Sequence, residues 1–259
     1  MFDPLLDVAL RAALAGGEAV MCAYADPNCE ITQKSDATPV TEADLASERV
    51  IVEMLLAAYP GIPVVSEETV PEAGFACPTA PRFWLVDPLD GTKEFVARNG
   101  EFAVLIGLIE DGRPVLGVVH GPAIGLTYIA HGSGTAMMRR GQGAFTPIRA
   151  RVPAPDGVVV VHSRSHENSR RLAEYFQGKP VLGRLKCGSA LKFGVLAAGE
   201  ADCYPRFGTT MEWDTAAGQA ILEAAGGSVV TPDGKPLRYA KPDFRNADFT
   251  ARGKMRDPA

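Results

Sequence analysis

The hydrophobic positions near the start of the chain repeat at the spacing of amphipathic helices. This spacing predicts a helix over 4–25, although Gly16 and Gly17 weaken its middle. A polar segment follows at 34–44, and helical spacing then returns and predicts a second helix over 42–58. The chain therefore opens with two predicted helices.

Short apolar runs in the next part of the chain predict strands. The runs are 63–66, 83–86, 102–109, 114–119 and 126–130. Asp111-Gly112 separates two of these runs, and this dipeptide is typical of a hairpin turn between antiparallel strands. This region therefore predicts an antiparallel meander.

The second half of the chain has a different pattern. Pro147, Pro153 and Pro155 interrupt it, and they place a predicted domain boundary near 150, with an N-terminal α+β half at 1–150 and a C-terminal α/β half at 151–259. Strands alternate there with helices because apolar runs alternate with helical spacing. The predicted strands are 158–161, 180–185, 201–204 and 228–231, and the predicted helices are 168–177, 189–198 and 213–225.

Composition excludes several classes of protein. The 259 residues carry a net charge of −5, which argues against a general surface for a nucleic-acid polymer or a membrane. No apolar run reaches the roughly 18 residues of a membrane span, and the acidic N-terminus does not fit a signal peptide. The five cysteines are scattered without a C-x-x-C pair, so a reducing cytoplasm fits best. Loose association of the first helix with the inner membrane face is left open.

Two aspartates follow the apolar run that ends at Val86. Asp87 and Asp90 lie in D-P-L-D-G-T, where Pro88 stiffens and Gly91 relaxes a predicted turn. Such a turn can direct two carboxylates and a backbone carbonyl at one point, as hard divalent cations require. The alternative is an ordinary polar turn after a strand.

Three further acids extend this set. Glu67 follows the strand at 63–66, and two neighbouring strands that both end in acids would bring those acids together, although adjacent Glu67 and Glu68 also fit a solvated loop. Asp214 is predicted just inside a helix N-terminus, where an ordinary first-turn acid is equally at home. Asp44 fits either this set or a capping box with Thr41.

The acids of this set would repel one another unless cations neutralise them. Oxygen ligands with few histidines suit Mg²⁺ better than Zn²⁺. The four histidines show no ligand spacing, and neither a G-x-S-x-G motif nor a nucleotide-binding glycine loop is present. The sequence therefore favours metal-dependent chemistry over a serine hydrolase.

Three motifs together resemble one phosphatase superfamily. S-E-E at 66–68, D-P-L-D-G-T at 87–92 and W-D-T-A-A-G at 213–218 are similar to those of the Mg²⁺-dependent, lithium-sensitive superfamily that contains inositol monophosphatase, fructose-1,6-bisphosphatase and the 3′(2′),5′-bisphosphate nucleotidases. The longer strings D-P-L-D-G-T-K-E-F, R-N-G-E-F and Y-P-R-F-G resemble the CysQ-type nucleotidase branch. The resemblance implies a layered α-β-α-β-α sandwich with its site between the two halves.

The resemblance also implies roles for individual residues. Glu67, Asp87 and the Leu89 carbonyl would hold one Mg²⁺, and Asp87, Asp90 and Asp214 a second; a weaker third ion would bind near Glu67 through water. Thr92 and Glu67 would orient the attacking water, and Asp44 would support the water network. The backbone N–H groups of Gly91 and Thr92 would cradle the phosphate, so the substrate would lie against Leu89, Asp90, Gly91, Thr92 and Asp214.

A bisphosphate nucleotide carries a second phosphate that needs donors. Ser189 and Lys192, at the start of a predicted helix, and Arg206 are the candidates, although Lys192 and Arg206 equally fit solvated surface positions. His162-Ser163-Arg164-Ser165 is a weaker candidate for the nucleotide side.

The expected activity is hydrolysis of the 3′-phosphate of adenosine 3′,5′-bisphosphate to AMP, with 3′-phosphoadenylyl sulfate as a further substrate. The alternatives are an inositol monophosphatase, a broad sugar-phosphate phosphatase, and a non-catalytic nucleotide-binding protein. The expected partner is a small phosphorylated nucleotide, and a homodimer is left open.

Overall fold

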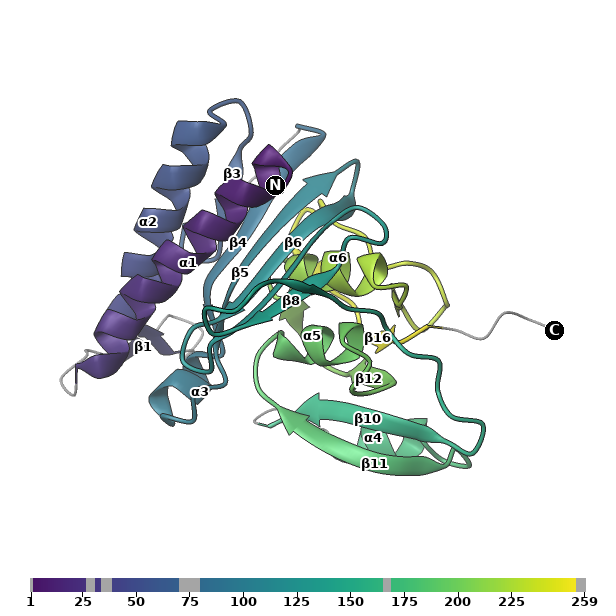
Figure 1. Cartoon of the computed structure of the whole chain (residues 1–259). Helices are drawn as coiled ribbons and strands as arrows, with labels where there is room; N and C mark the ends of the chain where they lie inside the picture. Colours follow the sequence, from purple (N-terminus) through teal and green to yellow (C-terminus); the bar gives the residue numbers. More distant parts are fainter. Residues whose placement is uncertain (1, 27–30, 34–38, 70–79, 165–168, 255–259) are drawn as a thin grey trace.

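The structure is a computed structural model, and it describes residues 2–26, 31–33, 39–69, 80–164 and 169–254. Its layers alternate as α-β-α-β-α, with a seven-stranded sheet and a five-stranded sheet separated by helices (Figure 1). The predicted layered sandwich is therefore confirmed.

The helices are α1 (Pro4–Ala25), α2 (Glu42–Ala58), α3 (Thr92–Val96), α4 (Ser169–Tyr175), α5 (Leu191–Ala197) and α6 (Ala216–Ala224). The strands of the first half are β1 (Ile31–Gln33), β2 (Pro39–Thr41), β3 (Val64–Ser66), β4 (Arg82–Asp90), β5 (Ala103–Glu110), β6 (Arg113–Gly121), β7 (Leu126–His131), β8 (Met137–Arg140) and β9 (Thr146–Pro147). The strands of the second half are β10 (Val158–Ser163), β11 (Val181–Cys187), β12 (Cys203–Arg206), β13 (Thr210–Met211), β14 (Ser228–Val230), β15 (Arg245–Asn246) and β16 (Phe249–Arg252).

The first layer consists of α1 and α2, which cover one face of the seven-stranded sheet (Figure 1). The two glycines that weaken helix propensity do not interrupt α1. Both are buried, and a Cβ at Gly16 would lie 2.6 Å from Ile51 of α2, while one at Gly17 would lie 2.6 Å from His120 of β6. Close packing therefore offsets the propensity cost of about 1 kcal/mol per glycine.

The seven-stranded sheet has the order β3-β4-β5-β6-β7-β8-β9, and β3 is the strand that runs parallel to its neighbour. Its β5–β6 hairpin turns at Asp111 and Gly112, which have φ values of 48° and 70°, so the predicted hairpin is confirmed. The strands β8 and β9 at the far edge were not predicted.

The stretch around Pro88 differs from its prediction. A tight turn was expected after Val86, but β4 continues to Asp90. The register shifts between Asp87, which pairs with Leu105, and Asp90, which pairs with Ala103. The stretch is therefore a bulge within a strand, a position where proline is tolerated because the ladder is already interrupted.

The middle layer consists of α5 and α6, which lie between the two sheets (Figure 1). One continuous hydrophobic cluster joins strands of the first sheet, such as Leu105 and Val119, to Phe193 and Ile221 of these helices and to Val161 of the second sheet. The site therefore rests on a core to which both halves of the chain contribute. The boundary near 150 stays a prediction.

The five-stranded sheet has the order β11-β10-β12-β16-β14, and Leu172 of α4 and the following Phe176 pack on its outer face. The strands β10, β11 and β12 are parallel, as the predicted crossovers require. The strand β16 was not predicted, and it pairs antiparallel with both β12 and β14.

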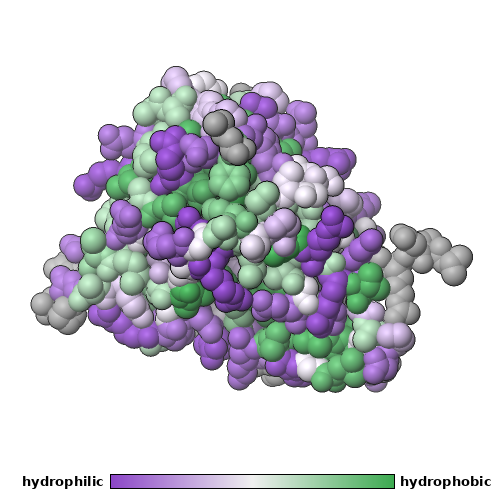
Figure 2. Space-filling model, in the orientation of Figure 1, coloured by the Kyte–Doolittle hydropathy of each residue, from purple (hydrophilic) through white to green (hydrophobic). Residues whose placement is uncertain are grey.

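Hydrophilic and hydrophobic residues are interspersed on the face of the molecule in Figure 2, with hydrophobic ones visible over the region of β10 and β11. The edge strand β11 contributes two exposed leucines, Leu182 at 51% and Leu185 at 40% exposure. Among the described helices, none combines the length and the apolar character that crossing a bilayer requires.

Candidate metal centre

Two of the predicted acids are brought together by parallel strand pairing. Ser66, the last residue of β3, pairs with Val86 of β4, and the Glu67 N–H donates to the Val86 carbonyl at 3.2 Å. Glu67 and Asp87 come directly after these paired positions. The expectation that two neighbouring strands would bring their acids together is therefore met.

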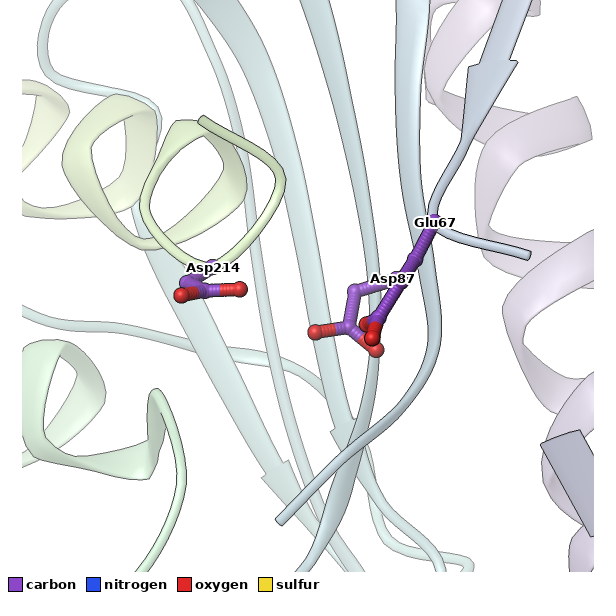
Figure 3. Close-up of side chains that lie close together, drawn as sticks. All are labelled: Glu67, Asp87 and Asp214. Carbon is purple, nitrogen blue, oxygen red and sulfur yellow. The ribbon is translucent and has the colours of Figure 1, made fainter. Parts of the chain in front are cut away.

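Asp214 reaches the same place from the other side, out of the turn that precedes α6 (Figure 3). The prediction that it lies inside the helix is wrong, because α6 begins at Ala216 after the N-cap Thr215. The Met211 N–H donates to Asp214 Oδ2 at 2.8 Å, and this bond fixes the carboxylate within the turn.

Glu67, Asp87 and Asp214 form a cluster in which one carboxylate oxygen of each lies within 4.8 Å of the others (Figure 3). Burial raises the pKa of Asp87 well above its usual range, and the charges of Glu67 and Asp90 raise it further. Burial also raises the pKa of Asp214, with further contributions from Asp90 and Glu67. Without a compensating charge, the ionised cluster is therefore unfavourable.

This donor set fits a hard divalent cation. All three groups offer carboxylate oxygens, which Mg²⁺ and similar ions prefer, and the three come from separate parts of the chain that are each held by backbone hydrogen bonds or strand pairing. A cation among them would remove the repulsion that raises the pKa values.

Asp90 lies beside the cluster, since its charge raises the pKa of both Asp87 and Asp214. Its Oδ2 accepts two hydrogen bonds from the second half of the chain, from Ser189 Oγ at 2.5 Å and from the Ala190 N–H at 2.5 Å. Burial raises the pKa of Asp90, and these two bonds together with the charge of Lys192 lower it. Oδ1 is the carboxylate atom that these bonds leave available to a cation.

The bulge between these aspartates is held from both sides. The Leu89 N–H donates to Asp87 Oδ1 at 3.0 Å, and the Leu89 carbonyl accepts from Thr92 Oγ1 at 3.4 Å. Ser47 of α2 donates to the Pro88 carbonyl at 2.9 Å. Gly91 follows with φ of 93°, which lets the chain turn directly into α3 at Thr92.

Asp44 is buried in the first turn of α2, with 3% of its surface exposed. Its charge contributes to the raised pKa of Asp87, so it lies near the cluster. The side chain of Thr41 lies outside the described part of the structure, and the capping alternative for Asp44 is untested.

A cavity of about 260 Å³ opens onto the cluster. Its lining includes ten of the predicted metal, catalytic and phosphate residues, and Asp44 is not among them: Glu67, Asp87, Leu89, Asp90, Gly91, Thr92, Ser189, Lys192, Arg206 and Asp214. Residues from both halves of the chain therefore share one cavity.

The three residues predicted for a second phosphate differ in placement. The Ser189 hydroxyl is committed to Asp90, and Ser189 precedes α5 rather than starting it. Lys192 is 4% exposed, and its Nζ donates to the carbonyls of Ser189 and Cys187. Arg206 Nη2 donates to the Thr209 carbonyl at 3.4 Å, while its buried Nε has no partner among the described residues.

The K-E-F residues after Thr92 now have a structural explanation. Lys93 and Glu94 line the cavity, and Glu94 is 4% exposed. Phe95 packs against Tyr24 and Phe102, with ring centroids 5.1 Å and 5.3 Å away. These contacts anchor α3, whose first residue is Thr92.

Sequence reasoning missed several residues around the cavity. Tyr204, Thr209 and Thr210 line it; Tyr204 belongs to Y-P-R-F-G, a string noted for its resemblance in which only Arg206 was given a role. Of the weaker candidates, Ser163 lines the cavity and Arg164 pairs with Glu101, while Ser165 lies outside the described residues. Glu101 belongs to R-N-G-E-F, which was noted for its resemblance without a role.

Comparison with known proteins agrees with this geometry. The chain is 45% identical over 248 residues to the 3′(2′),5′-bisphosphate nucleotidase CysQ of Salmonella typhimurium, covering 95% of this chain and 98% of the relative. The crystal structure of CysQ from Bacteroides thetaiotaomicron superposes with a TM-score of 0.82 at 35% identity, covering 96% of this chain and 97% of that one. The inositol monophosphatase from Anabaena gives a TM-score of 0.74 at 27% identity, with 96% and 90% covered. Residues 1–255 match the Inositol monophosphatase family. The chain therefore belongs to the inositol monophosphatase family.

Proposed function

We propose that this chain is a Mg²⁺-dependent 3′(2′),5′-bisphosphate nucleotidase. Its main reaction is hydrolysis of the 3′-phosphate of adenosine 3′,5′-bisphosphate, which gives AMP and inorganic phosphate, and 3′-phosphoadenylyl sulfate is a further substrate. The proposal is supported by curated relatives that carry the nucleotidase name at 43–45% identity over nearly their full length.

One observation carries the proposal: basic side chains and the acidic cluster line the same cavity. The charge of Arg206 lowers the pKa of Asp214, and the charge of Lys192 lowers that of Asp90, so both basic side chains lie near the carboxylates. A substrate with two phosphates places one at the metal centre, and the other can then pair with one of these basic side chains. An uncharged inositol ring has no comparable need for them.

Glu67, Asp87 and Asp214 would hold one or more divalent cations, with the Leu89 carbonyl and Asp90 Oδ1 as further ligands. When bound, such cations neutralise the carboxylates, polarise the phosphoryl group and promote loss of a proton from water. The donor set fits Mg²⁺, and we propose two such ions, with a weaker third near Glu67.

The residues of the chain then orient the reactants. The Thr92 hydroxyl and the Glu67 carboxylate hold the attacking water, and Asp44 supports it from α2. The N–H groups of Gly91 and Thr92 donate to phosphoryl oxygens, which become more negative during in-line attack. As the water oxygen bonds to phosphorus, the bond from phosphorus to the ribose 3′-oxygen breaks, and that oxygen leaves as the hydroxyl of AMP.

A phosphate-release assay tests this proposal against its close alternatives. Purified protein with Mg²⁺ is given adenosine 3′,5′-bisphosphate or inositol 1-phosphate at matched concentrations. We expect a higher kcat/KM for the nucleotide. Preference for the inositol ester would instead favour an inositol monophosphatase or a broad sugar-phosphate phosphatase, and binding of nucleotide without phosphate release would favour a non-catalytic protein.

Other properties follow from the resemblance and await their own measurements. We propose that millimolar lithium inhibits the enzyme, and an insensitive enzyme would weaken the assignment. A cytoplasmic location remains a sequence-based prediction, whereas peripheral association with the inner membrane face and a homodimer are left open. Cell fractionation tests the first two and sedimentation tests the third.

A further inference from the structure

Glu101 connects the first half of the chain to two loops of the second half. Its carboxylate accepts from Arg164 Nε at 2.9 Å and Nη2 at 2.7 Å, and it also accepts from the Gly188 N–H at 2.7 Å. Arg164 follows β10, and Gly188 precedes α5. Hydrogen bonding from Arg164 lowers the pKa of Glu101, so this carboxylate is an ionised acceptor.

The backbone around Glu101 is packed closely enough to fix this contact. A Cβ at Gly188 would lie 2.6 Å from the Glu101 carbonyl oxygen, so no larger residue fits there without movement. The same carbonyl would lie 3.4 Å from a Cβ at Gly91, which places Glu101 beside the turn into α3. The Glu101 N–H donates to Asn99 Oδ1 at 2.9 Å, so its own loop is also held.

The residue after Gly188 has an unfavourable backbone conformation. Ser189 has φ of 55°, a value that is strained for a residue other than glycine and persists only when its surroundings hold it. In this conformation Ser189 Oγ and the Ala190 N–H both reach Asp90 Oδ2. The bond from Gly188 to Glu101 is one residue away.

We propose that Glu101 is a positioning residue: through Gly188 it holds Ser189 and Ala190 on Asp90 Oδ2, so that Oδ1 stays directed to a cation. The assignment rests on the proposed function, because it gives Asp90 a metal to bind. Neither Glu101 nor Arg164 is among the described residues that line the cavity. Glu101 therefore acts through other residues and does not touch the phosphate.

Metal binding without substrate tests this role directly. Free Mn²⁺ is measured by electron paramagnetic resonance while it is titrated into the wild-type protein and the Glu101→Ala variant. We expect one class of Mn²⁺ site to weaken by about 10- to 100-fold, the range for loss of a residue that orients a metal ligand. Unchanged Mn²⁺ binding in Glu101→Ala would overturn the proposal.

The matched control is Glu110→Ala. Glu110 also pairs with an arginine, Arg82, at the other end of the β4–β5 pair, and its side chain is 33% exposed against 22% for Glu101. We expect this variant to bind Mn²⁺ like the wild type. Equal weakening in both variants would show a general effect of losing a surface ion pair, and it would also overturn the proposal.

A double-mutant cycle separates positioning from loss of folding. Since Glu101 acts through the loop of Ser189, the effects of Glu101→Ala and Ser189→Ala on Mn²⁺ affinity should be clearly less than additive. Glu101→Gln keeps an acceptor for Gly188, so its Mn²⁺ affinity should lie between those of Glu101→Ala and the wild type. If Glu101→Ala does not fold, the cycle is measured with Glu101→Gln and Ser189→Ala instead. Fully additive effects would contradict the proposal.

Steady-state kinetics give a second readout. The Mg²⁺ concentration for half-maximal activity should rise in Glu101→Ala, while kcat at saturating Mg²⁺ recovers most of its wild-type value. A wild-type protein without nucleotidase activity would refute the proposed function. A normal wild-type enzyme whose Mg²⁺ requirement is unchanged by Glu101→Ala would refute the positioning role alone.

Discussion

Gly117 of β6 lies directly against the backbone of Ala217 in α6. A Cβ at Gly117 would be 2.2 Å from the Ala217 carbonyl oxygen and 2.9 Å from its carbonyl carbon. Gly107 of the neighbouring strand would place a Cβ 2.8 Å from Ala216. Two glycines therefore let α6 lie close to the sheet, and α6 begins two residues after Asp214.

Replacement of Gly117 by alanine should destabilise the protein by about 1–3 kcal/mol, because the added Cβ meets backbone atoms of Ala217, which cannot move aside as a flexible side chain can. The shift of α6 should also move Asp214 and reduce kcat by about 10²-fold, the cost of a misplacement of roughly 1 Å. Thermal unfolding and phosphate release measure the two effects. Gly61→Ala is the control, since a Cβ there meets nothing within 4 Å. Wild-type Tm and kcat in Gly117→Ala would contradict the close contact between β6 and α6.

The charge of Asp90 should be required for turnover. Asp90→Asn keeps an oxygen that can accept from Ser189 but removes the negative charge, and we expect kcat to fall by about 10²–10³-fold. Exposed Asp7, paired with Arg11 on α1, provides the control variant Asp7→Asn. Near-normal turnover in Asp90→Asn would contradict a role for Asp90 in metal binding.

Binding of Mg²⁺ should release protons. The folded protein raises the pKa of Asp87 and Asp214, so protons occupy these sites more readily than in the unfolded chain, and a cation must displace them. Mg²⁺ affinity should therefore increase as pH rises. Calorimetry in two buffers with different protonation enthalpies measures the released protons, and identical heats in both buffers would rule the effect out.

The same shifts predict how stability depends on pH. Because the folded pKa values lie above the unfolded ones, the metal-free protein gains stability from these groups at low pH and loses it as pH rises through the folded values. Mg²⁺ should consequently raise the Tm more at about pH 8 than at about pH 5. A larger rise in Tm with Mg²⁺ at about pH 5 than at about pH 8 would contradict this account.

Arg206 should contribute to recognition of the second phosphate. Arg206→Gln should raise KM for adenosine 3′,5′-bisphosphate by roughly tenfold or more, the cost of losing a charged hydrogen bond, and should change KM for adenosine 3′-monophosphate little. Arg170→Gln, on the exposed surface of α4, is the control. An equal rise in KM for both substrates would mean that Arg206 acts through the neighbouring Asp214 instead.

Local patterns were sufficient to predict the first part of the site. Glu67 and Asp87 follow two short strands, and parallel pairing of those strands places the acids together. The position of Asp214 beside Glu67 and Asp87 depends on contacts between distant parts of the chain. Only the joint occurrence of the three motifs predicted that Asp214 belongs to the same site. The bulge at Pro88 could not be told from a turn, because proline and glycine mark both.

The second-phosphate residues show where sequence reasoning fails. Ser189 was expected to bind substrate, but its hydroxyl donates to Asp90, 99 positions earlier in the chain. Nothing near either residue in the sequence reveals that bond. Glu101 was overlooked for the same reason, since its partners Arg164 and Gly188 lie 63 and 87 positions away.

The position of β16 has a consequence for how the chain folds. It comes after every other described strand in chain order, yet it pairs with both β12 and β14 in the interior of the second sheet. During synthesis, β12 and β14 therefore leave the ribosome before the strand that joins them, and each waits with an unpaired edge. Completion of the second sheet, and with it of the wall of the site that carries Arg206, therefore depends on the arrival of β16.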